Sequence, residues 1–350
     1  MVRSGQLSLK LAAIAAAFAM MGAPAPSARG GELITEFPLP SKDAFPTSIA
    51  AAGDNIWFIE FFVNKIARFN AKTGELEEFA IPSLKSEPLD LAVDPSGKVW
   101  FTEQDVAALA SFDPKTKKFN ELILPDTSVR PASILASAGG MIWVLGWNSD
   151  ALVGYNPATG KFVQKRIPTE GSNSYDMAED KKGRIWFTER SKNKLAMYDP
   201  RTDKFSEWDV SGQPQSPLGT VVDSEGAIWF LAMVDNHMVR FDTATEKTKI
   251  FPLPKNKGAK EIAIDGKDNI WLVLGTDNKI LRFNTKTGIV NSFDIASGEA
   301  KPNSVGVDSA GRVWFTGSNP ARIGYLNSKL IGEIKTDLNV KIKPFKGLGK

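Results

Sequence analysis

The sequence predicts an all-β protein that folds as a seven-bladed β-propeller with four-stranded blades. One observation is an aromatic phrase of the type Ile-Trp-Phe that recurs seven times, with its tryptophan at Trp57, Trp100, Trp143, Trp186, Trp229, Trp271 and Trp314. A second is the spacing of this phrase, which is 43 residues in every case except one of 42. Repeats of this length made of short strands are typical of propeller blades. Each blade buries its apolar face only against its neighbours, so we expect seven blades to close into a ring without a free sheet edge.

Each repeat contains four short β-rich segments, which we expect to form an up-and-down sheet. In the second repeat the inner strand covers 87–93, and an Asp-Pro-Ser-Gly turn leads to a second strand over 99–103. A third strand over 109–113 and an outer strand over 118–125 follow. We interpret the repeated tryptophan as a packing residue that fills the wedge between adjacent blades. The Asp-rich turns are interpreted as hairpin corners, because they offer too few oxygen ligands for a calcium loop.

A segment that precedes the first repeat is predicted to close the ring. Residues 32–39 match the outer strands of later repeats, such as 247–254, but no inner strand comes before them. The segment can therefore pair into the seventh blade. The alternative is that 330–335 is the seventh blade's own outer strand. In the first case the basic tail lies outside the ring or adds a further strand.

The N-terminus has the order of a secretory signal. Basic residues are followed by an apolar run over 11–21 and then by small residues up to Ala28, after which we expect cleavage. The apolar run is too short to span a bilayer. The sequence has no cysteine, which excludes disulfides, thiolate metal sites, a cysteine nucleophile and a lipidated N-terminal cysteine. We expect a periplasmic or secreted bacterial protein without a transmembrane segment, with a signal peptide over 1–28, a propeller over 32–328 and a basic tail over 329–350.

The net charge of +3 describes the two ends of the chain and not the ring. The first thirty residues hold three bases and no acid, and the predicted tail holds six lysines against two acids. The ring between them is therefore acidic. Nothing in this distribution resembles a nucleic-acid groove.

The candidate site follows from the topology of the blades. The start of each inner strand and the end of each second strand lie at the same end of a sheet, so these ends converge around the channel, where loops on a rigid scaffold carry function. The candidate catalytic carboxylates at these ends are Glu103, Glu189, Asp90, Asp176 and Glu261. The candidate ligand-binding residues are Tyr175, Trp147, Lys260 and Asn303. Trp208 also breaks the repeat period, and we interpret it as a packing residue of an outer strand.

The repeated phrases resemble those of a known enzyme family. The pattern Trp-Phe-Thr-Glu at 100–103 and 186–189, with Asn-Lys-Ile-x-Arg-Phe at 64–69 and 278–283, is similar to the streptogramin lyases, the virginiamycin B lyase family. The resemblance covers about 32–328. It implies a seven-bladed propeller that opens a cyclic depsipeptide antibiotic by elimination with the help of Mg²⁺. It also implies a histidine base just after the Pro of an inner strand, a second histidine in a neighbouring blade, and glutamates that hold the metal.

The chain departs from the family at the histidine positions. These are occupied by Thr47, Leu89, Ala132, Tyr175, Leu218, Lys260 and Asn303. The one histidine, His237, is predicted at the surface, at the start of a third strand where other repeats have lysine. The second repeat keeps most of the implied metal pattern, with Glu87 and Glu103 as the candidate Mg²⁺ ligands, but Leu89 cannot accept a proton.

Three functions are compatible with these residues. The first is a non-catalytic exported propeller whose channel mouth binds a small molecule, a peptide or an envelope protein. The second is a Mg²⁺-dependent carbon-oxygen lyase of the streptogramin lyase type, or a related metal-dependent propeller enzyme, in which a desolvated carboxylate replaces the histidine. The third is a structural subunit of an envelope complex that docks through the basic tail. The sequence favours the first, because it requires no missing residue.

Overall fold

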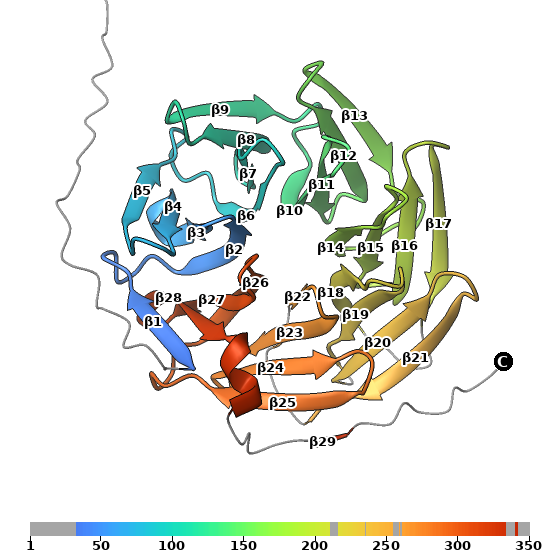
Figure 1. Cartoon of the computed structure of the whole chain (residues 1–350). Coiled ribbons are helices and arrows are strands. Elements are labelled where there is room, and N and C mark those ends of the chain that lie inside the picture. Colours follow the sequence, from blue (N-terminus) through green and yellow to red (C-terminus); the bar gives the residue numbers. More distant parts are fainter. Residues whose placement is uncertain are drawn as a thin grey trace, which may run out of the picture.

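A computed structural model describes residues 33–210, 216–234, 236–254, 259, 261–333 and 340–341. These residues form seven antiparallel sheets arranged as blades around a central channel (Figure 1). The seven-bladed propeller predicted from the sequence is thus confirmed. No helix among these residues is both long and apolar enough to cross a membrane.

The blades share one strand order, from the channel outward. The inner strands are β2 (Pro46–Ala52), β6 (Pro88–Val93), β10 (Arg130–Ala136), β14 (Ser174–Glu179), β18 (Pro217–Val222), β22 (Ile262–Ile264) and β26 (Pro302–Val307). The second strands are β3 (Asn55–Glu60), β7 (Val99–Glu103), β11 (Ile142–Trp147), β15 (Ile185–Glu189), β19 (Ile228–Ala232), β23 (Asn269–Leu274) and β27 (Arg312–Ser318). The third strands are β4 (Lys65–Asn70), β8 (Ala108–Asp113), β12 (Ala151–Asn156), β16 (Lys194–Asp199), β20 (His237–Asp242), β24 (Lys279–Asn284) and β28 (Ala321–Asn327). The outer strands of blades one to six are β5 (Leu76–Ala80), β9 (Lys118–Ile123), β13 (Lys161–Arg166), β17 (Lys204–Asp209), β21 (Lys247–Pro252) and β25 (Ile289–Asp294).

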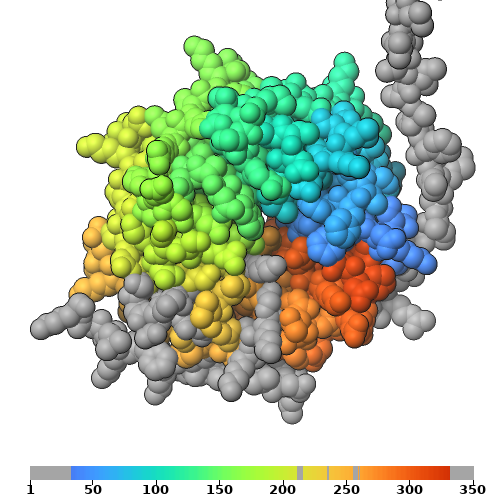
Figure 2. Space-filling view, turned by 180° about the vertical axis from the view of Figure 1, so that it is seen from behind, coloured from blue at the N-terminus to red at the C-terminus, as the bar shows by residue number. Residues whose placement is uncertain are grey.

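The outer strand of blade seven comes from the N-terminal side of the chain. β1 (Ile34–Pro38) pairs antiparallel with β28, with Ile34 opposite Leu326 and Pro38 opposite Arg322. Figure 2 shows the result, since the blue start of the ring lies against its red end. The Glu36 carboxylate also accepts a hydrogen bond from Arg322 Nη1 at 3.2 Å. The predicted closure is confirmed.

The alternative closing segment, 330–335, does not form a strand of blade seven in its described residues. Its residues up to Glu333 belong to the 3-10 helix η2 (Ser328–Glu333), and the rest lie outside the described residues. Further along, β29 (Val340–Lys341) pairs with β25 and adds a fifth strand to blade six. Part of the basic tail therefore contacts the ring. The predicted signal peptide, 1–28, lies outside the described residues.

The repeated tryptophans pack between blades, as predicted from the sequence. Each of the seven is at most 2 % exposed. Trp100 of blade two, for example, joins a core cluster that includes Ile142 and Val144 of blade three. Trp208 on β17 stacks on Trp186 with ring centroids 5.2 Å apart, which confirms its interpretation as a packing residue. Shared interblade cores of this kind make the ring one cooperative scaffold for the loops at its ends.

In five blades the indole N–H of the tryptophan is bound by an aspartate. In each case the aspartate stands two residues after the inner-strand residue that pairs with the tryptophan. The acceptors are Asp94 at 2.8 Å, Asp180 at 2.9 Å, Asp223 at 2.7 Å, Asp265 at 3.0 Å and Asp308 at 2.8 Å. The other carboxylate oxygen accepts backbone N–H groups of the turn, as Asp94 Oδ1 does from Ser96 and Lys98. We call this contact the Asp–Trp latch. It joins the hairpin corner to the wedge residue of the same blade.

Candidate functional site

The predicted strand ends do meet at one end of the blades, which we call the mouth. Pro88 at the start of β6 lies opposite Glu103 at the end of β7, and Pro46 and Glu60 form the same pair in blade one. In blade four, Ser174 lies opposite Glu189. The topology therefore brings these side chains to the face where the inner strands enter the channel wall.

A β-bulge follows the start of the inner strand in blades one, two, three, four, five and seven, and in blade three the inserted residue is Ala132, between Pro131 and Ser133. In blade two the register moves from Pro88 opposite Glu103 to Leu91 opposite Phe101, so two inner-strand residues face a single residue of β7. Bulges redirect side chains and are frequent beside functional sites. In the five blades other than blade three, the first bulge residues are Thr47, Leu89, Tyr175, Leu218 and Asn303, and the second are Ser48, Asp90, Asp176, Gly219 and Ser304. The register shift itself is not visible in the sequence.

Asp90 joins three blades at this level. Its Oδ1 accepts hydrogen bonds from Ser48 Oγ of blade one at 2.7 Å and from the N–H of Leu91 at 2.9 Å. Its Oδ2 accepts the N–H of Ile134 in blade three at 2.9 Å. Burial raises the pKa of Asp90, although these hydrogen bonds oppose the effect. The carboxyl is fully used by the scaffold.

Asp176 holds the equivalent place in blade four. Its Oδ2 accepts the N–H of Thr220 in blade five at 2.7 Å, and its Oδ1 accepts the N–H of Met177 at 2.8 Å. Burial is the largest cause that raises the pKa of Asp176 to about 7, and the negative charge of Asp90 adds to it. The two aspartates therefore interact across the mouth. A carboxyl with a pKa near neutrality can exchange protons at physiological pH.

Tyr175 places an aromatic side chain at the same level. It is half-buried and packs against the core cluster shared by blades five and six. Burial raises the pKa of its hydroxyl, and the charges of Glu261 and Asp176 raise it further. Tyr175, Asp176 and Glu261 thus belong to one neighbourhood. Lys260, predicted to bind ligand beside Glu261, lies outside the described residues.

Trp147 and Asn303 also lie at the mouth. Trp147 is half-buried at the end of β11, opposite Arg130. Asn303 is half-buried as the first bulge residue of blade seven. Their positions agree with the expected face of the ring, and their role in binding stays a prediction.

Three glutamates at the ends of second strands are completely buried. Glu60, Glu103 and Glu189 are 0 % exposed, and their carboxyl oxygens make no hydrogen bond. Burial raises the pKa of each to about 8, and the negative charge of a glutamate on the outer strand of the same blade contributes. These neighbours are Glu78, Glu121 and Glu207. The three buried carboxyls are therefore mostly protonated at neutral pH.

The two candidate metal ligands of blade two have different neighbours. The carboxylate of Glu87 accepts a hydrogen bond from Arg130 Nη2 at 3.2 Å, and the same guanidinium reaches Asp105 at 3.2 Å. Glu103 lies next to Glu121 of β9, toward the outside of the blade. Across the described part of the chain, no group of three or more His, Cys, Asp or Glu side chains is arranged to hold a metal ion. The carboxylate of Glu87 is bound by Arg130 and that of Glu103 is buried beside Glu121, and a shared Mg²⁺ site at these two residues stays a prediction.

His237 begins β20, opposite Ala232, at the position where Lys65, Lys194 and Lys279 begin their third strands. Its side chain is half-buried. The structure agrees with the predicted strand position.

The structure adds aromatic residues at the mouth that were not predicted from the sequence. Phe45, Phe61 and Phe62 form a cluster at the mouth of blade one, with Phe45 and Phe62 ring centroids 4.8 Å apart and those of Phe61 and Phe62 5.4 Å apart. Phe62 is 67 % exposed on the 3-10 helix η1 (Phe61–Val63). Exposed apolar groups of this kind mark contact sites. The sequence feature that could have identified this cluster is the pair of adjacent phenylalanines, Phe61 and Phe62, directly after Glu60.

Comparison with known proteins agrees with this architecture. A family model described as the virginiamycin B lyase family matches residues 27–195 and 152–337. The chain belongs to the virginiamycin B lyase family. No curated protein matches the sequence significantly.

Solved structures of virginiamycin B lyases share the fold. A streptogramin B lyase structure is 25 % identical with a TM-score of 0.78, and the match covers 83 % of this chain and 96 % of that one. Virginiamycin B lyase from Staphylococcus aureus is 22 % identical with a TM-score of 0.78, covering 83 % of this chain and 98 % of that one. A catalytically inactive His-to-Ala variant of the Staphylococcus aureus enzyme, with quinupristin, is 22 % identical with a TM-score of 0.77 over the same shares.

Proposed function

We propose that this protein is an exported member of the virginiamycin B lyase family that binds a ligand at the mouth and does not open streptogramin B antibiotics. The observation that carries the proposal is the side chain at the first bulge position, where the family's histidine is expected. In the six bulged blades this residue is Thr47, Leu89, Ala132, Tyr175, Leu218 or Asn303. General base catalysis typically contributes about 10² to 10⁴ in rate. Without an imidazole at this position, the scaffold retains a mouth but lacks the expected base.

The side chains at the mouth favour a ligand with apolar or aromatic groups. Half-buried Phe45 and exposed Phe62 form an aromatic cluster, and Tyr175 and Trp147 are half-buried at the same end of the ring. Aromatic rings give large contact areas at low entropic cost. The raised pKa values of Glu60, Glu103 and Glu189 reduce the negative charge there at neutral pH. A small molecule or peptide with an apolar group suits this surface better than a strongly charged ligand.

A related structure supports binding without the base. The inactive His-to-Ala variant of the Staphylococcus aureus enzyme is described together with quinupristin. A propeller of this family that lacks one histidine is thus described together with a ligand. We infer a similar separation of binding from catalysis for this chain.

The test is an assay with the mature protein, a streptogramin B antibiotic and Mg²⁺, in which the linear product is followed by mass spectrometry. We expect no turnover, and saturable binding of the intact antibiotic or of another apolar ligand by calorimetry. The variant that tests the binding surface is Phe62→Ala. It should weaken binding of the ligand without changing the thermal stability of the ring. Turnover near about 1 per second, in the ordinary enzyme range, would contradict the proposal.

One observation favours the alternative function, a lyase that uses a carboxylate base. Asp176 faces the mouth with a pKa raised to about 7, chiefly by burial, which suits a general base at neutral pH. If turnover is found, Asp176→Asn should abolish it and His237→Ala should leave it unchanged. The opposite pattern would assign the base to His237.

Export is proposed from the basic, apolar and small-residue order of 1–28. Expression of the full chain in a bacterium should yield a shortened protein in the periplasmic or extracellular fraction. A variant with charged residues within 11–21 should stay in the cytoplasm. Retention of the full-length wild-type chain in the cytoplasm would refute the assignment.

A further inference from the structure

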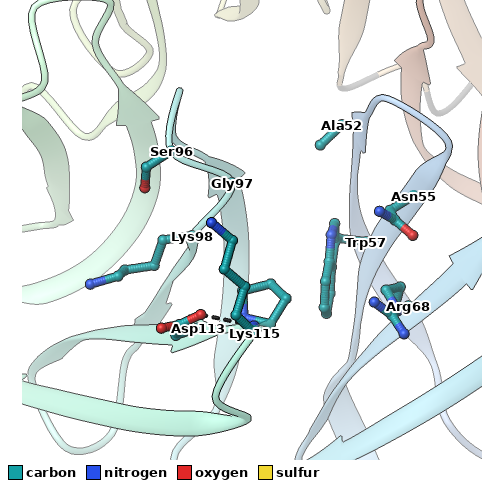
Figure 3. A pocket seen from close by; sticks show the side chains of 10 residues that line it. Ala52, Asn55, Trp57, Arg68, Ser96, Gly97, Lys98, Asp113 and Lys115 are labelled. Atoms are coloured by element: carbon teal, nitrogen blue, oxygen red, sulfur yellow. Dashed lines mark hydrogen bonds between the residues drawn. The ribbon is translucent and has the colours of Figure 1, made fainter.

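A pocket of about 400 Å³ lies between blades one and two, at the end of the blades opposite the mouth (Figure 3). Blade one contributes Ala52, Asn55 and Trp57 to its lining, and blade two contributes Pro114 and Lys115. These residues take no part in the proposed function, because they lie at the ends of the strands away from the mouth and in the adjoining turns. The pocket coincides with a break in the Asp–Trp latch.

The latch rule identifies the residue that is missing there. Ala50 pairs with Trp57 in blade one, as Ala92 pairs with Trp100 in blade two. Two residues after Ala92 stands Asp94, whose Oδ2 accepts the Trp100 N–H at 2.8 Å. Two residues after Ala50 stands Ala52. Blade one therefore has a methyl group where five other blades have a carboxylate.

Trp57 consequently has a donor without an acceptor. Its side chain is 2 % exposed, and no described residue accepts its indole N–H. The indole nitrogen is not sealed from solvent, because Trp57 lines the pocket. An acceptor that enters the pocket can therefore reach this N–H.

The neighbouring side chains favour a negatively charged acceptor. In Figure 3 the Lys115 side chain rises along the blade-two side of the pocket toward Gly97, whereas the Lys98 side chain points away, toward the Trp100 ring 5.5 Å from its ammonium. Asn55, on the blade-one side, adds an amide that can donate. The carboxylate in the lining, Asp113, is already bound to the N–H of Lys115 at 2.8 Å.

The adjacent groove provides an internal comparison. A pocket of about 350 Å³ between blades seven and one is lined by Lys72, Arg312 and Asn327. There the latch is intact, since Asp308 Oδ2 accepts the Trp314 N–H at 2.8 Å and the Arg312 Nε–H at 2.6 Å. There the chain itself supplies the acceptor of the indole N–H, and Asp54 is the carboxylate in the lining of the groove.

We propose that the pocket between blades one and two binds a small organic carboxylate, whose oxygen takes the place of the missing latch aspartate. The carboxylate accepts the Trp57 N–H and is neutralised by the Lys115 ammonium. Five aspartate carboxylates bind indole N–H groups in the same way elsewhere in the ring, so the geometry selects this group.

The experiment follows the indole N–H signals of the full mature protein by two-dimensional NMR during titration with acetate, succinate and phosphate. The Trp57 signal is assigned as the one that disappears in Trp57→Phe. We expect this signal alone to shift saturably with acetate and succinate, with weaker binding of phosphate. Lys115→Ala should weaken the binding severalfold, and Lys72→Ala, in the comparison groove, should leave it unchanged.

Ala52→Asp supplies the decisive variant. The new carboxylate should move the Trp57 signal toward the position of the latched indoles, raise the melting temperature and abolish the acetate response. The gain in stability separates this result from misfolding. A Trp57 signal that ignores both carboxylates at tens of millimolar overturns the proposal. So does a phosphate response at least as strong as that of acetate, or an acetate response that survives in Ala52→Asp.

Discussion

The Asp90 carboxylate of blade two accepts the backbone N–H of Ile134 in blade three at 2.9 Å, while its other oxygen accepts the Ser48 hydroxyl of blade one. One side chain at the mouth thus joins three consecutive inner strands. Asp176 makes the corresponding contact to Thr220, from blade four to blade five. The same two carboxyls are candidate chemical groups, so scaffold and site share their residues at the channel mouth.

Asp90→Ala should destabilise the ring by about 2 to 4 kcal/mol, because it leaves buried donors on Ser48 and Ile134 without an acceptor. Asp90→Asn should lose less, since it keeps one acceptor oxygen. Chemical denaturation of the two variants measures the difference. The control is Asp105→Ala, which removes an exposed ion pair with Arg130 and should cost less than about 1 kcal/mol. Equal losses for Asp90→Ala and Asp105→Ala would contradict the interblade role.

The buried glutamates predict that the ring is less stable at alkaline pH. The pKa of Glu189 is about 8 in the folded protein, raised mainly by burial, against the ordinary value of 4.5. Between these values the folded state holds a proton that the unfolded state has released. The free energy of unfolding should therefore be highest near pH 5 and fall as pH rises to 8, by at most about 1.4 kcal/mol per pH unit for each such group.

Glu189→Gln tests this pH dependence, because glutamine stays neutral. The variant should be less sensitive than the wild type between pH 5 and 8, so that its relative stability increases toward pH 8. Urea unfolding at several pH values provides the measurement, with the exposed Glu170→Gln as control. Parallel pH profiles for Glu189→Gln and the wild type would show that the folded pKa of Glu189 is ordinary.

Removal of the aspartate of the Asp–Trp latch should lower the stability of the ring by a similar amount in each of the five blades. Asp223→Ala removes the acceptor of the Trp229 N–H and of the backbone N–H groups of Glu225 and Ala227. We expect a loss of about 1.5 to 3 kcal/mol, typical of hydrogen bonds to a charged group. Thermal unfolding measures it, and Glu225→Ala, on the same turn, is the control. A loss within 0.5 kcal/mol of that control, roughly the range of a neutral surface change, would reject the latch as a stabilising contact.

More of the fold than of the candidate site could be predicted from the sequence. The regular tryptophan spacing specifies the blades, and the match of 32–39 to outer strands specifies the closure by β1, because both depend on local pattern. The bulge at Leu89 and Asp90 could not be predicted, since a register shift leaves no mark in composition. The orientation of the Glu103 side chain could not be predicted from the sequence either. Its carboxyl lies near Glu121 of β9, although β8 separates β7 from β9 in the sheet.

Ring closure predicts a specific effect of truncation. A protein that begins after Pro40 lacks β1 and exposes the edge of β28, which is a template for association between chains. It should unfold at lower temperature and aggregate, whereas a protein that begins at Glu32 should behave like the mature chain. Light scattering and thermal unfolding compare the two. A monomeric truncated protein with unchanged melting temperature would mean that another segment covers β28.

The last prediction concerns the pair of mouth aspartates. Burial, together with the charge of Asp90, raises the pKa of Asp176 to about 7. A neighbouring negative charge disfavours ionisation, so Asp90→Asn should lower the pKa of Asp176. The carbon-13 shift of the Asp176 carboxyl, followed by NMR from pH 4 to 9 and assigned with Asp176→Asn, reports this value directly. Asp105→Asn, which lies among exposed groups, should not change it. A pKa of Asp176 near the ordinary value of 3.8 in the wild type would remove the proton acceptor that the alternative, catalytic function requires, and would leave the mouth as a binding surface.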